Sequence, residues 1–578
     1  MTTGSLPSDF EQSRPGRGGG RRSAELDGRH ATCVIDPRSF PNAENGRQRL
    51  RPPRSSHHFG LPVTLPSSAL DDSRQHLVRT GIAGLDDILG GGLPANRLHL
   101  IDGEPGTGKT TLAIQFLLTG RAEGERCLYV TLSETAEELV GSSKSHGWSL
   151  DGIEIFELAT QAGDEQGEAY TLFHPAEVEL QETVSAVLTA VDRSKPARVV
   201  FDSLSEMRML ARDPLRFRRQ VLALKQFFAG RECTVLILDD KSGPEGDLQL
   251  HSLAHGVISL ERLPMEYGAE RRRLQVKKLR GTQFTGGYHD FRIRTGGLEV
   301  YPRLKRRDGP DVLAAEVVRS GSEELDALLG GGVGRGTSTL ITGAAGTGKS
   351  VLATQFARFA VERGEKAVVY MFDERVATAV TRARGLWPET PNFSFDKKLT
   401  LRQIEPTEMS PGEFSTTVAR AVDDGVSLVV IDSLNGLLQA MPNERSLAVH
   451  VHELLSYLAS RGVTTLMTLV QRGVFGAPVD EAAEVSYLAD TVILLRYFEH
   501  AGAVRQATSV VKKRIGPHER TIRECRVQPG GFRVGEPLTA FHGVLTGSPV
   551  YQGERGPLMP PNERANLAAK SPEKRNVE

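Results

Sequence analysis

The stretch Gly103-Glu-Pro-Gly-Thr-Gly-Lys109-Thr110 follows a short apolar run and opens a helix-like segment. A second stretch, Gly343-Ala-Ala-Gly-Thr-Gly-Lys349-Ser350, repeats the pattern in the same context. Glycines at this spacing let backbone N–H groups close around phosphates, the lysine reaches the terminal phosphates, and the hydroxyl holds Mg²⁺. The sequence therefore predicts two sites for a nucleoside triphosphate and Mg²⁺. The predicted nucleotide-binding residues of the two loops are Gly103, Gly106, Thr107, Gly108, Lys109, Thr110 and Thr111, and Gly343, Gly346, Thr347, Gly348, Lys349, Ser350 and Val351.

The segment upstream of each loop is repeated as well. Thr80-Gly-Ile-Ala-Gly-Leu-Asp86-Asp-Ile-Leu-Gly-Gly-Gly92 corresponds to Ser320-Gly-Ser-Glu-Glu-Leu-Asp326-Ala-Leu-Leu-Gly-Gly-Gly332. The length of 578 residues leaves room for two nucleotide domains of about 230 residues each, together with tails. We expect these domains at 76–303 and 315–545, joined by a charged linker at 304–314. Residues 1–75 and 546–578 are rich in polar residues and proline, so we expect disordered tails there.

Composition limits the classes of function. The 71 Lys and Arg residues balance 72 Asp and Glu residues, which gives no electrostatic argument for nucleic acid or an anionic membrane. The four cysteines are scattered without a C-x-x-C pair, and no run of 18 apolar residues occurs. These features predict a protein of the reducing cytoplasm that does not span a membrane.

Apolar, β-rich runs alternate with helix-length segments in both halves of the chain. This alternation predicts an α/β fold in which each half is a mostly parallel sheet flanked by helices. The loops would then lie at the carboxyl ends of central strands, where open α/β sheets bind ligands. The predicted strands cover residues 98–102, 127–132, 199–202, 234–238 and 256–260 in the first half, and 338–342, 367–372, 428–432, 465–469 and 490–495 in the second.

Several carboxylates follow these predicted strands. Asp202 and Asp432 each end an apolar run and precede Ser-Leu, so both fit the aspartate that holds Mg²⁺ through water. The hydroxyls of Thr110 and Ser350 would be the other groups that hold the metal. Hydrolysis also needs a carboxylate that orients or deprotonates the nucleophile. Glu134 and Glu374 follow another repeated strand and are the candidates; the alternative for each is an ordinary exposed loop glutamate.

Together these features resemble the KaiC-like branch of the RecA family, two-domain ATPases, over residues 76–545. Further matches are Glu270-Arg-Arg-Arg-Leu-Gln-Val-Lys-Lys278-Leu-Arg280-Gly-Thr282 and Val511-Lys512-Lys-Arg514. The resemblance implies tandem RecA-like domains in stacked rings, usually homohexamers, with ATP between subunits. It also implies that Lys278, Arg280 and Thr282, and correspondingly Lys512 and Arg514, reach a neighbouring subunit's phosphates. Read without the family, Lys-x-Arg on a strand also fits a solvated edge strand.

Two departures from the family pattern affect the expected activity. The family carries two adjacent carboxylates after the active-site strand; the first domain has Ser133-Glu134, and only the second keeps a pair, Asp373-Glu374. We therefore expect slower hydrolysis in the first domain. The family's clock proteins phosphorylate themselves on an adjacent Ser and Thr, and this chain has Ser486-Tyr487 there. Ser486 is the candidate site for serine autokinase activity.

Two other classes of function remain open. One is a DNA recombination or repair motor resembling RadA, which would need a basic DNA-facing loop or a Cys₄ zinc module. The other is a signalling scaffold whose ATP-dependent ring binds a protein partner. The sequence shows neither motor feature, so we expect no nucleic acid partner.

Overall fold

The computed structural model describes residues 76–157, 175–211, 213–241, 248–264, 268–306, 316–388, 398–439, 447–471, 486–545 and 550–553. The predicted N-terminal tail, most of the predicted linker and the C-terminal residues from 554 lie outside these ranges. No helix in the described ranges is long and apolar enough to cross a membrane.

The described part of the first domain is built on a nine-stranded sheet with the strand order β11-β10-β9-β8-β3-β7-β6-β4-β5. The strands from β8 to β5 in that order run parallel, and β9, β10 and β11 continue the sheet as antiparallel strands. Its elements are β1 (Leu77–Val78), α1 (Ala83–Ile88), β2 (Leu93–Pro94), β3 (Leu98–Gly103), α2 (Lys109–Ala122), β4 (Cys127–Thr131), α3 (Ala136–Ser145), β5 (Ile153–Glu157), α4 (Pro175–Ser194), β6 (Arg198–Asp202), α5 (Leu204–Ala211), α6 (Pro214–Phe228), β7 (Thr234–Asp240), α7 (Leu248–Leu253), β8 (Gly256–Leu263), β9 (Arg271–Leu279), β10 (Tyr288–Arg294) and β11 (Gly297–Tyr301).

The second domain repeats this architecture. Its nine-stranded sheet, again within the described ranges, has the order β16-β15-β17-β18-β14-β19-β20-β21-β22. Its elements are β12 (Val317–Val318), α8 (Glu323–Leu328), β13 (Val333–Gly334), β14 (Ser338–Gly343), α9 (Lys349–Glu362), β15 (Ala367–Met371), α10 (Val376–Leu386), β16 (Leu399–Gln403), α11 (Pro411–Asp423), β17 (Leu428–Asp432), α12 (Leu434–Gln439), α13 (Leu447–Ser460), β18 (Thr464–Val470), β19 (Thr491–His500), β20 (Ala503–Lys513), β21 (Arg523–Gln528), β22 (Gly531–Pro537), β23 (Phe541–His542) and β24 (Val550–Tyr551).

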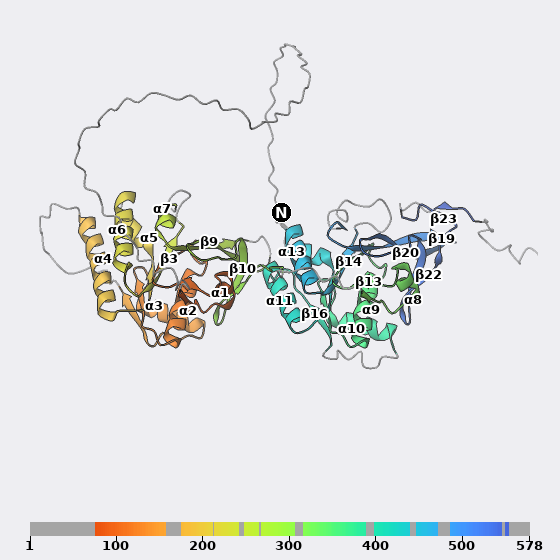
Figure 1. The fold of residues 1–578 in the computed structure, drawn as a ribbon, viewed down its shortest axis with the longest axis horizontal. Coiled ribbons are helices and arrows are strands. Elements are labelled where there is room, and N and C mark those ends of the chain that lie inside the picture. The colour runs from red at the N-terminus through yellow and green to blue at the C-terminus, as the bar shows by residue number, and fades with distance from the viewer. Residues whose placement is uncertain are drawn as a thin grey trace, which may run out of the picture. The chain divides into compact units, whose positions relative to one another are not determined.

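The central parallel strands of each sheet carry apolar side chains on both faces, and successive side chains of a strand point to opposite faces. In β6, Val200 packs into the core beneath α2 and α3, whereas Val199 and Phe201 pack into the core beneath α4, α5 and α6. Figure 1 shows α2 and α3 on one side of the first sheet and α5 and α6 on the other. Strand β15 of the second domain divides its residues between two cores in the same way.

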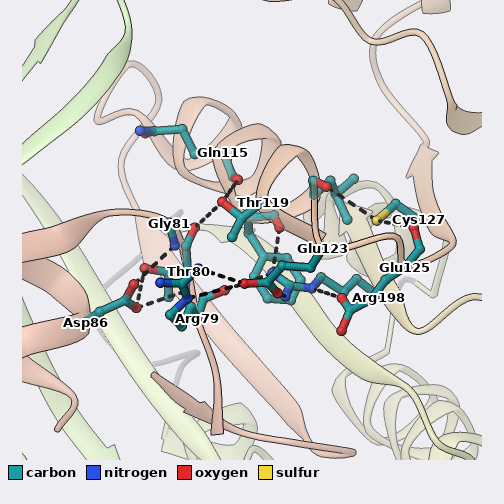
Figure 2. A network of polar contacts seen from close by, with 12 residues as sticks. Arg79, Thr80, Gly81, Asp86, Gln115, Thr119, Glu123, Glu125, Cys127 and Arg198 are labelled. Carbon is teal, nitrogen blue, oxygen red and sulfur yellow. Dashed lines mark hydrogen bonds and ion pairs between the residues drawn. The ribbon is translucent and has the colours of Figure 1, made fainter. Parts of the chain in front are cut away.

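The repeated upstream segment has a structural role that explains its residue types. Asp86, in the first turn of α1, accepts hydrogen bonds at Oδ1 from the backbone N–H of Thr80, at 2.8 Å, and from its hydroxyl, at 2.7 Å. Figure 2 shows Asp86 facing Thr80 and Gly81. Asp326 accepts the corresponding hydrogen bond from the backbone N–H of Ser320, at 2.8 Å. In each domain, one aspartate therefore holds the backbone that precedes the first helix.

Arg198, labelled in Figure 2, is a buried cation that lies one residue before the predicted strand 199–202. Arg198 begins β6 with 1% of its surface exposed, and its guanidinium donates to the backbone oxygens of Arg79 and Phe116 at 2.8 and 2.9 Å. It also forms ion pairs with Glu123, at 2.5 Å, and with Glu125. The second domain has Leu428 at this register.

The predicted α/β fold and its ten strands are confirmed; the strand 428–432 has the predicted bounds, and the others differ by one to several residues. The antiparallel strands β9 to β11 and β20 to β22 were not among the ten predicted strands, because they mix charged, polar and apolar residues instead of forming a continuous apolar run. One boundary needs correction. Strand β24 lies within the predicted disordered tail 546–578 and pairs with β23, so ordered structure extends past residue 545.

Candidate functional site

Each glycine-rich loop, 103–110 and 343–350, connects a central strand to a helix. In the first domain β3 ends at Gly103 and α2 begins at Lys109, and in the second β14 ends at Gly343 and α9 begins at Lys349. Gly106 and Gly346 have φ of 79° and 81°, a conformation that favours glycine. The loops are thus strand-to-helix turns whose helix N-termini point partial positive charge at a bound anion.

A side chain on the last glycine of each loop would meet a strand residue and would strain the backbone, since φ is 103° at Gly108 and 94° at Gly348. A Cβ on Gly108 would lie 2.6 Å from Cδ1 of Ile293, and one on Gly348 would lie 2.8 Å from Cγ2 of Val527. The loops are pinned internally by Thr107 and Thr347, whose buried hydroxyls donate at 2.8 Å to the backbone oxygens of Glu104 and Ala344. Of the flanking predicted residues, Thr111 is half-buried and Val351 is buried in α9.

The two loop lysines are both nearly buried and have different partners. Lys109 donates to the backbone oxygens of Gly103 and Glu104, at 2.9 and 3.0 Å, and pairs with Asp240 Oδ1 at 2.7 Å. Lys349 donates to the backbone oxygen of Ala344 at 2.7 Å. Burial lowers the pKa of Lys349 to about 8, against the opposing attraction of Asp432. An anion that approaches Lys349 would therefore favour its charged form.

The predicted metal-side groups meet in both domains. Thr110 Oγ1 donates to Asp202 Oδ2 at 3.1 Å, and Ser350 Oγ donates to Asp432 Oδ1 at 3.1 Å. Hydroxyl and carboxylate oxygens are the ligand types that Mg²⁺ takes beside a nucleotide's phosphates. Together with the glycine loop and the lysine, the residues of each site fit Mg-ATP.

Each strand-end aspartate has a second partner that the sequence reasoning missed. Tyr129, on β4, donates its hydroxyl to Asp202 Oδ2 at 2.6 Å, whereas Thr468, on β18, donates to Asp432 Oδ1 at 2.5 Å. Burial raises the pKa of Asp202, although these hydrogen bonds oppose that shift. A polar residue inside an otherwise apolar predicted strand was the one available signal for Tyr129 and Thr468.

The candidate catalytic carboxylates have different surroundings in the two domains. The pKa of Glu134 is raised by burial first and then by the negative charges of Asp202 and Glu138. Glu374 is ion-paired with Arg382 at 2.5 Å, and Asp373 accepts a hydrogen bond from Ser433. The acidic pair of the second domain is therefore fixed by protein partners.

The residues expected to reach a neighbouring subunit lie in the last two residues of β9 and β20 or shortly after these strands. Their cations hold carbonyl groups of their own domain: Lys278 that of Ala254 at 2.7 Å, Arg280 that of Ser252 at 3.1 Å, Lys512 that of Ser486 at 2.9 Å, and Arg514 that of Tyr487 at 2.8 Å. Thr282 follows β9 and is half-buried. Their role toward a second subunit stays a prediction. Ser486, the candidate phosphosite, is also half-buried, and its backbone oxygen accepts from Lys512.

Comparison with known proteins matches both domains to one family. The family model described as "ATPase: KaiC" matches residues 78–305 and again residues 318–539. The circadian clock oscillator protein KaiC of Synechococcus elongatus is 28% identical over 502 residues, which cover 84% of this chain and 94% of that protein. The circadian clock protein KaiC3 of Synechocystis is 26% identical over 488 residues, which cover 82% of this chain and 95% of that protein.

Proposed function

Since the chain belongs to the KaiC family of ATPases, we propose that each of its two domains binds and hydrolyses its own Mg-ATP. One observation carries the proposal: a buried loop lysine and a hydroxyl–aspartate pair, Thr110–Asp202 or Ser350–Asp432, occur at the same place in both domains. In this assignment Lys109 and Lys349 hold the terminal phosphates. The two aspartates hold Mg²⁺ through water.

The number of sites is tested by counting bound nucleotide. Lys109→Ala and Lys349→Ala should each halve the ATP retained at saturation, and the double variant should retain none. Arg193→Ala is a suitable control, because Arg193 lies on the exposed side of α4 and pairs only at the surface with Glu154. Complete loss of binding in one single variant with unchanged size in solution would contradict two independent sites.

The roles of Glu134 and Glu374 follow from their position after corresponding strands. We propose that each orients the nucleophile, and that the first domain hydrolyses ATP more slowly because it offers Glu134 alone where the second offers Asp373 and Glu374. Glu374→Gln should then remove most of the turnover and Glu134→Gln the smaller remainder, while both variants still bind ATP. A larger loss in Glu134→Gln would reverse the assignment of the faster domain.

We further propose that the chain acts as a homohexameric ring with ATP clamped between subunits. Nucleotide that contacts two subunits stabilises the assembled state by mass action. Lys278, Arg280, Lys512 and Arg514 would then exchange their present carbonyl partners for a neighbour's phosphates, and Thr282 would reach the same phosphates. Light scattering with and without Mg-ATP tests this assembly, and a monomer in both conditions would contradict it.

The second domain is proposed to carry a serine autokinase activity at Ser486, through which the ring would signal to a protein partner. The proposal is supported by the position of Ser486 before β19 and by the acidic pair of that domain. Phosphate mapping after incubation with Mg-ATP should find Ser486 modified in the wild type and unmodified in Ser486→Ala. Modification that persists undiminished in Ser486→Ala would refute this site.

The RadA-like motor is separated from this proposal by one measurement. Single-stranded DNA should leave the ATPase rate unchanged, since the chain's 71 basic and 72 acidic residues provide no excess positive charge for a phosphate backbone. Marked stimulation by DNA would favour the motor.

A further inference from the structure

Among the described residues, the position at the end of the strand beside the glycine-rich loop is acidic in the first domain and apolar in the second. Asp240 ends β7 and pairs in register with Gly103, the first loop glycine. In the second domain Val470 ends β18 and pairs in the same register with Gly343. The two sites thus have the same backbone position occupied by a carboxylate in one and by an isopropyl group in the other.

The carboxylate of Asp240 is directed at the loop lysine. Its Oδ1 lies 2.7 Å from Nζ of Lys109, and these side chains are 33% and 8% exposed. Ser205 keeps the carboxylate in place, because its hydroxyl donates to Asp240 Oδ2 at 3.2 Å and accepts from the backbone N–H of Asp240 at 3.1 Å. The ion pair is therefore a positioned contact on a nearly buried lysine.

Neighbouring charged groups have other partners. Asp239 pairs with Arg208 at 2.7 Å, and Lys241 pairs with Asp102 at 3.2 Å. The negative charge of Asp240 also acts on Asp202, the metal-side aspartate, since it contributes to raising the pKa of Asp202. Asp240 thus adds negative charge beside the phosphate-binding loop. It also forms an ion pair with Lys109, the residue that would bind the terminal phosphates.

We propose that Asp240 is an internal competitor for Lys109, which makes the first domain the weaker of the two Mg-ATP sites. The inference rests on the proposed two-site function. Terminal phosphates must displace the carboxylate from Lys109 and then remain close to it, whereas Lys349 has a backbone carbonyl as its partner and Val470 nearby. The occupancy of the two sites would consequently differ at intermediate ATP concentrations.

The experiment measures each site separately in the full-length chain. A fluorescent ATP analogue with Mg²⁺ is titrated into Lys349→Ala protein, which leaves the first site, and into Lys109→Ala protein, which leaves the second. Into the first background we place Asp240→Val, which copies the second domain, and Asp240→Asn, which keeps the shape and the contact to Ser205. Into the second we place Val470→Asp. Asp192→Asn, an exposed acid of the first domain that pairs with Arg231, is the matched control for loss of one charge.

Removing one charge from a partly screened site should tighten the first site about five- to tenfold in both Asp240 variants. Val470→Asp should weaken the second site by a similar factor, and Asp192→Asn should change little. The gain should be larger for ATP than for ADP, because Lys109 serves the terminal phosphates; a change in packing alone would not discriminate between them.

Three results would overturn the inference. They are unchanged or weaker binding in both Asp240→Val and Asp240→Asn, an equal gain in Asp192→Asn, and equal gains for ATP and ADP. Binding at the first site that Lys109→Ala abolishes and the Asp240 variants leave unchanged would overturn only this inference. No binding at that site in any of these proteins would contradict the two-site function as well.

Discussion

Arg198 offers a test of how a buried cation stabilises the first domain. Replacing it by Met keeps an unbranched apolar chain but removes two ion pairs, with Glu123 and Glu125, and two hydrogen bonds to backbone oxygens. Removing one partner of a buried ion pair costs about 3–5 kcal/mol. The glutamates are 34% and 30% exposed, so water can solvate them after the change. We therefore expect a loss near the lower end, about 3 kcal/mol.

The two tryptophans of the chain allow each domain to be followed separately. Trp148 lies in the first domain and Trp387 in the second, so Trp387→Phe protein reports the first domain and Trp148→Phe protein the second. For a domain whose urea m-value is about 3 kcal/mol/M, Arg198→Met should lower the first midpoint by about 1 M. The midpoint reported by Trp387 should stay in place.

The control is Arg193→Met, which removes an arginine from the same domain whose side chain is 70% exposed. A surface ion pair contributes about 0–1 kcal/mol, so this variant should shift the first midpoint by at most about 0.3 M. Equal shifts in Arg198→Met and Arg193→Met would refute the reasoning from burial. Equal shifts in both domains would show that the change acts on something other than the first domain's core.

Two further predictions concern the loops and the strand beneath them. Burial alone would raise the pKa of Asp102, but hydrogen bonds from His251 and Ser259 outweigh it and lower that pKa to about 2. The carboxylate therefore stabilises the fold above its unfolded pKa of about 3.9, and this stabilisation is lost as the pH falls. The urea midpoints of wild type and Asp102→Asn should differ most near pH 6 and converge as the pH falls toward 2. Midpoints that move apart in acid would contradict this prediction. Gly348→Ala should abolish ATP binding in the second domain, because its Cβ meets Val527. Gly364 is the control, since it has the same φ of 94° and open space around it. Gly364→Ala should cost only about 1 kcal/mol of backbone strain and leave ATP binding intact.

The parts of the site that could be predicted from sequence are those whose residues are close together in the chain. The loop glycines, Lys109 and Thr110 form one continuous motif, and the aspartate at the end of an apolar run is set by the strand itself. The structure brings Asp202 to Thr110 as the parallel-sheet prediction required. Local pattern and fold class together were sufficient for that contact.

The residues that were missed depend on which strands are neighbours and on their register. Tyr129 reaches Asp202 because β4 pairs with β6, and the sequence contains no sign of that pairing. The predicted strand that became β7 ended at residue 238, so Asp240 fell outside it and its register opposite Gly103 could not be seen. Arg198 lies one residue before the predicted strand 199–202. Arginine is rarely buried without partners, and its partners Glu123 and Glu125 follow α2, far away in the sequence.

The missed residues Arg198 and Asp240 add differences between the two domains that the motifs do not show. The motif residues repeat in both domains, whereas Arg198 corresponds to Leu428 and Asp240 to Val470 at identical registers. A repeated motif can therefore establish that both domains have the same kind of site, but it carries no information about the relative strength of the two sites. That difference depends on charges placed beside the motif by the sheet, and for Lys109 the nearest such charge is the carboxylate of Asp240 at 2.7 Å.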